Sequence, residues 1–269
     1  MHSQNTTGVI GVGNMGTAIL QGIYSAKFCP AEKIVFCEKD TDRALQVSRQ
    51  TGIKDLPIDR LIDFSDIIIL AVKPAQTAEV CEILRSRGYN KILISIAAGI
   101  SIEKLKKMAG DTCKIIRAMP NLPALIGRGI TAAAYEKSAD NNLKEIISGL
   151  FRCIGEYIEV EEKNMNAVTA LSGSGPAYVF SFINALADGG VFCGLSKAAA
   201  LKLAWHTVLG SAELGIAGKE HPCALVDKIC SPGGTTITGL QVLDAGAWRG
   251  VLIDAVRAAC MKAADLEKS

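Results

Sequence analysis

Residues 8–16, "GVIGVGNMG", decide the fold. They hold a Gly-x-Gly-x-x-Gly fingerprint that follows a short apolar run and precedes a stretch with apolar residues at helical spacing, and a second strand-like run begins at residue 33. An isolated fingerprint often marks only a tight turn, but this order of strand, glycines, helix and strand is typical of a dinucleotide-binding unit. The sequence therefore predicts a Rossmann-type fold at its start.

Each position of the fingerprint has a physical role in holding a pyrophosphate. Gly11 permits the tight turn, Gly13 lets the anion approach the backbone, and Gly16 lets helix and strand pack closely. Asn14 and Met15 open the helix, whose free first-turn N–H groups face the anion. We expect all five residues to belong to the cofactor site.

The first half of the chain continues the alternation of strands and helices. Apolar runs of the kind that parallel sheets bury on both faces recur up to residue 121, and two further runs follow as expected edge strands. This alternation predicts an α/β fold with a doubly wound parallel sheet. The expected strands are 8–13, 33–38, 66–72, 91–99, 113–121, 129–135 and 155–160.

From residue 164 onward the sequence changes to long Ala- and Leu-rich stretches without a convincing strand. We therefore expect a dinucleotide-binding Rossmann domain over residues 1–162 and an all-helical domain for substrate binding and dimerisation over residues 163–269. The second domain is too short to bury several long helices on itself, so a homodimer is the default expectation.

Composition argues against several classes of protein. The 269 residues are 49% hydrophobic and 21% charged, with a net charge of +2 and no dense basic block of the kind that binds nucleic acid. The longest apolar run, "IIILAV" at 67–72, is far shorter than the roughly 20 residues of a membrane span, and the start lacks the basic leader of a secretory signal. Nine cysteines without a Cys-x-x-Cys pair predict reduced thiols in a cytoplasmic protein, with neither disulfides nor a metal site.

Glu38 ends the second expected strand and is the candidate acidic residue for the cofactor ribose. Its carboxylate would accept hydrogen bonds from the 2′-OH and repel a 2′-phosphate, which favours NADH over NADPH. The alternative is an ordinary solvated glutamate whose charge is offset by Lys39 and Arg43.

Three further turns follow expected strands at the carboxyl edge of the sheet, where ligands bind in such folds. Lys73 is either a contact to ribose or phosphate or a surface lysine before a helix, and Pro74 stiffens its turn and favours the first role. The turn after the fifth strand would lie at the nicotinamide ring. The cofactor candidates in these turns are Ala71, Val72, Lys73, Pro74, Ala97, Ala98, Met119, Pro120 and Asn121.

The helical part holds two stretches that combine glycines with hydroxyls, "TALSGSGPAYVF" (169–180) and "SPGGTT" (231–236). As turns before helices, they would present backbone N–H groups to an anion the size of a carboxylate. The alternative is a pair of ordinary helix caps with proline near the first turn. Two such stretches in one domain favour an anion cradle.

These motifs together resemble the pyrroline-5-carboxylate reductase family along essentially the whole chain. The resemblance is carried by "GVGNMGTAI", "AVKP", "RAMPN", "ALSGSGPAYVF", "LGSAEL" and, most specifically, "SPGGTTI" with the "LQVLDAG" and "RGVLIDAV" that follow it. It implies reduction of 1-pyrroline-5-carboxylate to L-proline, the last step of proline biosynthesis, by hydride from NADPH or NADH. It also implies a homodimer, often assembled into a homodecamer.

Carried over by position, the resemblance implies that Thr236 hydrogen-bonds the ring nitrogen of the substrate, which makes it the catalytic candidate. Backbone N–H groups of the "SPGGTT" turn would hold the substrate carboxylate, and residues of the "SGSGP" stretch would wall the pocket. The substrate candidates besides Thr236 are Ser174, Gly175, Pro176, Ser231, Gly233, Gly234 and Thr235.

Three positions depart from the family pattern. Glu38 stands where members that prefer NADPH often have serine, and Asp59 stands near a usual asparagine, so two carboxylates put NADPH preference in doubt. We count Asp59 among the cofactor candidates for this reason. Leu122 replaces a more usual threonine beside the expected nicotinamide turn.

The expected chemistry fits the absence of a titratable side chain in the glycine turns of both stretches. Reduction of a ketone needs a group that protonates the developing alkoxide, whereas a protonated imine becomes an amine without an obligatory proton transfer in that step. We therefore expect catalysis mainly by orientation. The alternatives are a β-hydroxyacid dehydrogenase-like enzyme, whose catalytic lysine "PAYVFSFINALADGG" lacks, another imine reductase, and a non-catalytic dinucleotide-binding protein.

Overall fold

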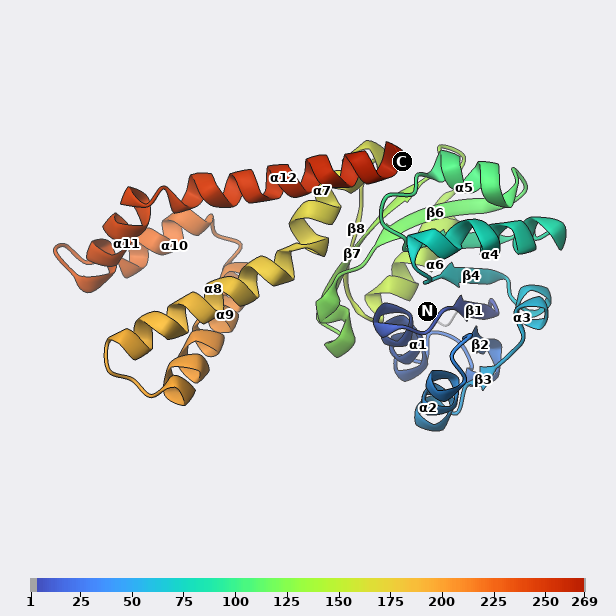
Figure 1. Ribbon diagram of the computed structural model, residues 1–269, viewed down its shortest axis with the longest axis horizontal. Helices are drawn as coiled ribbons and strands as arrows, with labels where there is room; N and C mark the ends of the chain where they lie inside the picture. Colours follow the sequence, from blue (N-terminus) through green and yellow to red (C-terminus); the bar gives the residue numbers. More distant parts are fainter. Residues whose placement is uncertain (1–3, 269) are drawn as a thin grey trace. The chain divides into compact units, whose positions relative to one another are not determined.

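The computed structural model describes residues 4–268 (Figure 1), and the chain divides into two compact units. Unit 1 takes in the chain up to Ser174 together with the segment that begins at Ala259, and unit 2 is Gly175–Ala258. The predicted boundary after residue 162 lies three residues beyond the last strand, which ends at Glu159. Unit 1 nevertheless extends further, because Met165 is fully buried against the core of the sheet.

Unit 1 is built on one eight-stranded sheet in the order β3-β2-β1-β4-β5-β6-β7-β8. β1 pairs in parallel with both β2 and β4, which makes the gap beyond their carboxyl ends the switch point of the sheet. The predicted doubly wound sheet is confirmed, although β7 runs antiparallel to β6 and the short β3 was not predicted. The strands are β1 Thr7–Ile10, β2 Ile34–Cys37, β3 Lys54–Asp55, β4 Ile67–Leu70, β5 Ile92–Ser95, β6 Lys114–Met119, β7 Gly129–Tyr135 and β8 Gly155–Glu159.

Helices cover both faces of this sheet (Figure 1), with α1, α2 and α6 in one core and α3, α4 and α5 in the other. The central strands are buried on both sides, which is why their sequences read as unbroken apolar runs. The helices of unit 1 are α1 Asn14–Ser25, α2 Thr41–Thr51, α3 Ile58–Phe64, α4 Pro74–Ser86, α5 Ile102–Ala109, α6 Asn141–Arg152 and α7 Met165–Val168, with the short helices η1 Ala31–Lys33, η2 Leu122–Ile126, η3 Glu162–Asn164 and η4 Thr169–Gly173.

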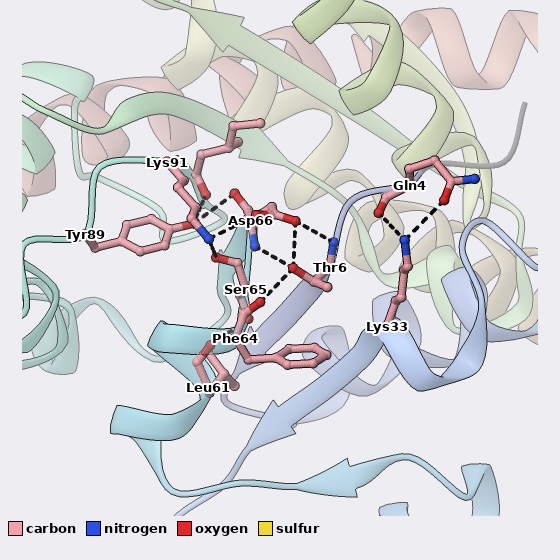
Figure 2. Close-up of polar contacts among 10 residues, drawn as sticks. Gln4, Thr6, Lys33, Leu61, Phe64, Ser65, Asp66, Tyr89 and Lys91 are labelled. Carbon is pink, nitrogen blue, oxygen red and sulfur yellow. Dashed lines mark hydrogen bonds and ion pairs between the residues drawn. The ribbon is translucent and has the colours of Figure 1, made fainter.

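At the amino edge of the strands, Asp66 ties the start of β1 to β4 and β5 (Figure 2). Its Oδ2 accepts hydrogen bonds from Thr6 N at 3.0 Å and Thr6 Oγ1 at 2.8 Å, and its Oδ1 pairs with Lys91 Nζ at 2.9 Å. Tyr89 Oη lies 3.1 Å from the carbonyl of Asp66 and 2.8 Å from that of Ile92. Partial burial raises the pKa of Asp66, but the bonds from Thr6 and Lys91 outweigh this and hold the pKa below its ordinary value. These bonds therefore hold the starts of β1, β4 and β5 together.

Unit 2 is helical, and its described helices share only a small core, made by Ile183, Ala187, Ala200 and Ala204 where α8 meets α9. The last helix, α12, begins in unit 2 and ends in unit 1. The helices are α8 Gly175–Phe192, α9 Lys197–Gly218, α10 Pro222–Ile229, α11 Thr235–Ala245 and α12 Trp248–Lys268.

Two further features concern the described part of the chain as a whole. Within residues 4–268, no helix combines the length and the apolar character needed to cross a membrane. All nine cysteines are unpaired, and the same residues hold no group of three or more His, Cys, Asp or Glu side chains that could bind a metal ion.

Candidate dinucleotide and substrate site

The three glycines of the fingerprint are required for three different reasons. Gly11 has a φ of +89°, a conformation that favours glycine. A Cβ on Gly16 would lie 2.0 Å from the carbonyl oxygen of Gly11, so only glycine lets α1 pack this close to the turn. A Cβ on Gly13 would meet nothing within 4 Å. Gly13 therefore faces open space, where an approaching anion needs it to be bare.

A cavity of about 530 Å³ opens at this turn, beyond the carboxyl ends of β1, β2 and β4. Its position at the switch point of the sheet is the one that dinucleotides occupy in such folds. Six of the predicted cofactor residues line it, namely Gly11, Gly13, Glu38, Ala71, Val72 and Lys73. Other charged and polar residues around the same cavity are Lys39, Arg43, Gln76 and Glu79.

Glu38 is held in place by the backbone rather than solvated. Its side chain is 10% exposed, and its Oε2 accepts a hydrogen bond from Val12 N in the glycine turn at 2.9 Å. Its Oε1 accepts one from Asp40 N at 3.1 Å. Arg43 Nη1 lies 3.6 Å from the same Oε2, so the neighbour that we expected to offset the charge is present. The carboxylate is thus fixed on the cavity wall beside the turn.

Asp55, which the sequence did not predict, is bonded to Glu38 but does not itself line the cavity. Its Oδ1 accepts a hydrogen bond from Glu38 N at 3.2 Å. Burial, with a smaller contribution from the charge of Glu38, raises the pKa of Asp55, although the bond from Glu38 N opposes this. Asp59 does not line the cavity, because it lies on the exposed first turn of α3 with Oδ1 3.7 Å from Arg87 Nη1. A two-residue strand, β3, places Asp55 here, and so short a strand leaves no hydrophobic pattern to detect.

Three helices that begin at predicted ligand turns lack a side-chain N-cap, whereas α5, which follows the turn at 97–99, has one. α2, α5, α6 and α9 begin with a side chain that bonds a first-turn N–H group, as Asp40 does for α2. The N-cap residues of α1, α4 and α11 are Gly13, Lys73 and Gly234, and none of them makes such a bond. α3, which begins after Pro57, is also uncapped. Uncapped helix starts leave N–H groups available to an external anion.

The cofactor turn at 97–99 and the turn expected at the nicotinamide are each held by hydrogen bonds within unit 1. Ala97 N donates to Ser95 Oγ at 3.3 Å. Asn121 Oδ1 accepts from Ile130 N at 2.9 Å, and its Nδ2 donates to Ser172 Oγ at 3.3 Å. The structure therefore brings the "RAMPN" turn against the "LSGSG" stretch, which lie far apart in the sequence.

The cavity leaves out the other predicted cofactor residues. Asn14, Met15 and Gly16 form the first turn of α1, and Pro74 opens α4. Ala97, Met119 and Pro120 are buried, and Ala98 is exposed. The candidates that do not line it are Asn14, Met15, Gly16, Asp59, Pro74, Ala97, Ala98, Met119, Pro120 and Asn121.

The first hydroxyl-rich stretch is helical, so the predicted turn at 169–176 is wrong. Thr169–Gly173 form a π-helix, and Ser174 N donates to the carbonyl of Thr169 at 2.9 Å. α8 begins directly afterwards at Gly175. The small side chains allow this wide helical turn, and the Ser174 N–H group is consumed by it. Ser174 belongs to unit 1, whereas Gly175 and Pro176 belong to unit 2.

The second stretch, "SPGGTT", is the expected turn before a helix. Gly233 has a φ of +65°, and Gly234 N donates to the carbonyl of Ser231 at 3.0 Å. α11 then begins at Thr235 without a side-chain cap, and Thr236 in its first turn is half-buried. The arrangement within unit 2 is thus a tight glycine turn that exposes the amide end of an 11-residue helix.

Comparisons with known proteins identify the family of the chain. A family model for pyrroline-5-carboxylate reductase dimerisation matches residues 162–266, and one for NADP oxidoreductase, coenzyme F420-dependent, matches residues 6–99. A pyrroline-5-carboxylate reductase of Synechocystis sp. is 41% identical over 262 residues, which cover 97% of this chain and 98% of that protein.

Solved structures agree along the same length. The Plasmodium falciparum pyrroline carboxylate reductase with NADP bound has a TM-score of 0.89 at 33% identity, covering 99% of this chain and 100% of that one. A pyrroline-5-carboxylate reductase from Coxiella burnetii has a TM-score of 0.93 at 31% identity with the same coverage. The chain therefore belongs to the pyrroline-5-carboxylate reductase family, NAD(P)H-dependent oxidoreductases of proline biosynthesis.

Proposed function

We propose that this chain reduces 1-pyrroline-5-carboxylate to L-proline by hydride transfer from NADH or NADPH, the final step of proline biosynthesis. The observation that carries the proposal is the cavity at the glycine turn, where bare Gly13 and the uncapped start of α1 fit a pyrophosphate. Family membership along the whole chain supports the substrate. α8 has no lysine near its start, which disfavours a β-hydroxyacid dehydrogenase-like enzyme.

Residues of the two hydroxyl-rich stretches hold different parts of the substrate. When bound, the nicotinamide supplies the hydride. The first-turn N–H groups of α11, after Ser231, Gly233 and Gly234, hold the substrate carboxylate, and the Thr236 hydroxyl holds the ring nitrogen. Ser174, Gly175 and Pro176 wall the pocket. Because neither "SGSGP" nor "SPGGTT" carries an ionisable side chain, the rate acceleration comes from orientation of a protonated imine.

The cavity wall favours NADH over NADPH. Glu38 lines the cavity and is fixed by Val12 N and Asp40 N, so a 2′-phosphate would meet its carboxylate. A ribose 2′-OH instead donates a hydrogen bond to Glu38. Arg43, Lys39 and Lys73 around the same cavity still allow NADPH to be used at lower efficiency.

The protein acts as a homo-oligomer assembled through unit 2. Large apolar side chains on its helices are exposed in the single chain, which supports a homodimer as the basic form. Assembly of the dimers into a homodecamer is what the resemblance implies. A cytoplasmic location fits the nine unpaired cysteines.

One assay tests the proposal against its alternatives. NADH and NADPH oxidation is followed with pyrroline-5-carboxylate and, in parallel, with small keto acids. We expect turnover of the imine alone, with higher kcat/KM for NADH. Turnover of keto acids alone would support the dehydrogenase, and cofactor binding without any turnover would support a non-catalytic protein. Glu38→Ser then shifts the preference towards NADPH, and an unchanged ratio would mean that Glu38 does not reach the ribose.

A further inference from the structure

Arg117 is a buried positive charge that the proposed chemistry leaves unexplained. It lies on β6, two residues before Met119, and is 1% exposed. Its Nη1 donates to Glu267 Oε1 at 2.7 Å and lies 3.7 Å from Glu162 Oε1. Its Nε and Nη2 have no hydrogen-bond partner among residues 4–268. A buried ion pair with unsatisfied donors is a poor device for stability alone, because its desolvation penalty offsets its attraction.

Glu267 joins three elements of unit 1 through this charge. It lies in the last turn of α12, and its second oxygen, Oε2, accepts a hydrogen bond from Asn166 Nδ2 at 2.6 Å. One carboxylate therefore connects β6, α7 and α12, and its two oxygens are both used. The other carboxylate near Arg117, that of Glu162, accepts a hydrogen bond from Ile102 N at 2.6 Å and so fixes the start of α5.

This cluster lies directly behind the turn at residues 97–99. Arg117 pairs with Ser95 across β5 and β6, and Ser95 Oγ in turn accepts the hydrogen bond from Ala97 N. Leu266, the neighbour of Glu267, lies against Gly99, where an added Cβ would be 3.4 Å from Leu266 Cβ. The last turn of α12 thus packs against the cofactor turn at 97–99 and is bonded to the strand that leads into the turn expected at the nicotinamide.

We infer that Arg117 and Glu267 are positioning residues that hold the turns at 97–99 and 119–121 in the spacing that hydride transfer requires. The inference rests on the proposed function and on the expectation that both turns contact the cofactor. Hydride transfer depends steeply on the approach of donor and acceptor, whereas affinity for the cofactor comes largely from the glycine turn at β1, at the other end of the site. Loss of the pair therefore slows the reaction more than it weakens binding.

The first test compares Glu267→Gln with Asp265→Asn, an exposed carboxylate of the same helical turn without a contact to Arg117. Glutamine keeps the size of the side chain and removes the charge. The dissociation constant of NADH is measured by fluorescence without substrate, and the hydride-transfer rate by single-turnover oxidation of bound NADH with pyrroline-5-carboxylate. We expect Glu267→Gln to lower the rate by about tenfold or more with a nearly unchanged dissociation constant, and Asp265→Asn to change neither.

The second test removes the charge pair without leaving a buried charge. Arg117→Met combined with Glu267→Met replaces the pair by apolar side chains, which commonly preserves or raises stability. We expect a melting temperature at or above that of the wild type, together with a slowed hydride transfer. A wild-type rate in this variant, or in Glu267→Gln, overturns the inference.

Failure of the proposed function is distinguishable from failure of this inference. If the wild-type protein oxidises neither cofactor with pyrroline-5-carboxylate, the proposed function is wrong and the positioning role falls with it. If the wild type turns over and Glu267→Gln does so at the same rate, only the positioning role is wrong. An equal loss of rate and of NADH affinity assigns the pair to general structure and also contradicts the inference.

Discussion

Units 1 and 2 differ in how far they bury their apolar side chains. In unit 1 the four residues of β4, Ile67–Leu70, are all 0% exposed, because helices cover both faces of the sheet. In unit 2 Phe192 is 94% exposed, Ile216 77% and Val242 69%. A single copy of unit 2 leaves much of its apolar surface in water. Unit 1 therefore covers its apolar core with its own chain, whereas unit 2 needs a second copy of the chain to cover its apolar surface.

The largest expected effect comes from placing charge on the open surface of unit 2. Leu209→Glu and Val251→Glu, at positions 54% and 65% exposed, each place a carboxylate on the apolar surface of unit 2 that we propose a second copy covers. Each such charge costs about 3 kcal/mol or more, and a two-fold interface buries it twice. We expect dissociation of the dimer, measured by size-exclusion chromatography with light scattering.

Leu45→Glu is the matched control, since Leu45 is 50% exposed on α2 of unit 1. This variant is expected to keep the wild-type mass and melting temperature. If Leu209→Glu and Val251→Glu both remain dimeric, the exposed apolar surface of unit 2 is not what a second copy covers.

Gly16→Ala is expected to damage unit 1 from within. The added Cβ would lie 2.0 Å from the carbonyl oxygen of Gly11, and backbone cannot move aside cheaply. We expect the free energy of unfolding, measured by urea titration, to fall by about 3 kcal/mol. Cofactor binding is lost as well. Gly13→Ala provides the contrast, because its Cβ meets open space: it should leave stability within about 0.5 kcal/mol while weakening NADH binding. Equal stability of the two variants would contradict the packing role of Gly16.

Thr236→Ala tests unit 2 at its proposed chemistry rather than at its assembly. Loss of one hydrogen bond to the substrate nitrogen lowers kcat/KM by a factor that corresponds to about 1–2 kcal/mol of transition-state stabilisation. Steady-state kinetics with varied imine concentration measures it. Thr238→Ala is the comparison, since the Thr238 hydroxyl lies 3.1 Å from the carbonyl of Gly234 and serves the helix. If both variants lose the same small amount of stability and no activity, Thr236 is a helix residue only.

The smallest expected effect lies at the amino edge of unit 1. Asp66→Asn removes the charge that Thr6 N and Lys91 Nζ bond, and we expect a loss of about 1 kcal/mol at neutral pH, because the pair is partly exposed. The folded-state pKa of Asp66 is depressed, so its contribution is present above the unfolded pKa of about 3.9 and is lost as pH falls through the folded value. Urea titrations should therefore show the difference shrinking below about pH 4. A difference that is constant with pH would exclude the ion pair as its source.

What the sequence predicts well is what neighbouring residues determine. Residues 8–25 contain the strand, the glycine spacing and the helix within one local unit. The turn at Gly233 is predicted by its glycine- and proline-rich composition. The π-helix at Thr169–Gly173 was mistaken for a turn because small hydroxyl residues suit both, and packing decides between them.

Long-range pairing accounts for the rest of what was missed. Asp55 reaches Glu38 only through a strand of two residues. Arg117 and Glu267 are 150 positions apart, and no spacing rule connects them. The sequence thus indicates where a cofactor binds, whereas the side chains that fix its surroundings emerge only from the folded sheet.

The path of α12 has a consequence for how the protein is made. The chain leaves unit 1 at Ser174 and returns to it at Ala259, so the whole of unit 2 is an insertion. On the ribosome, the partners of Arg117 and Gly99 at Glu267 and Leu266 emerge only after every residue of unit 2 has been synthesised. During synthesis the sheet therefore lacks the contacts from Glu267 and Leu266 while the apolar helices of unit 2 are already exposed to solvent or to a chaperone.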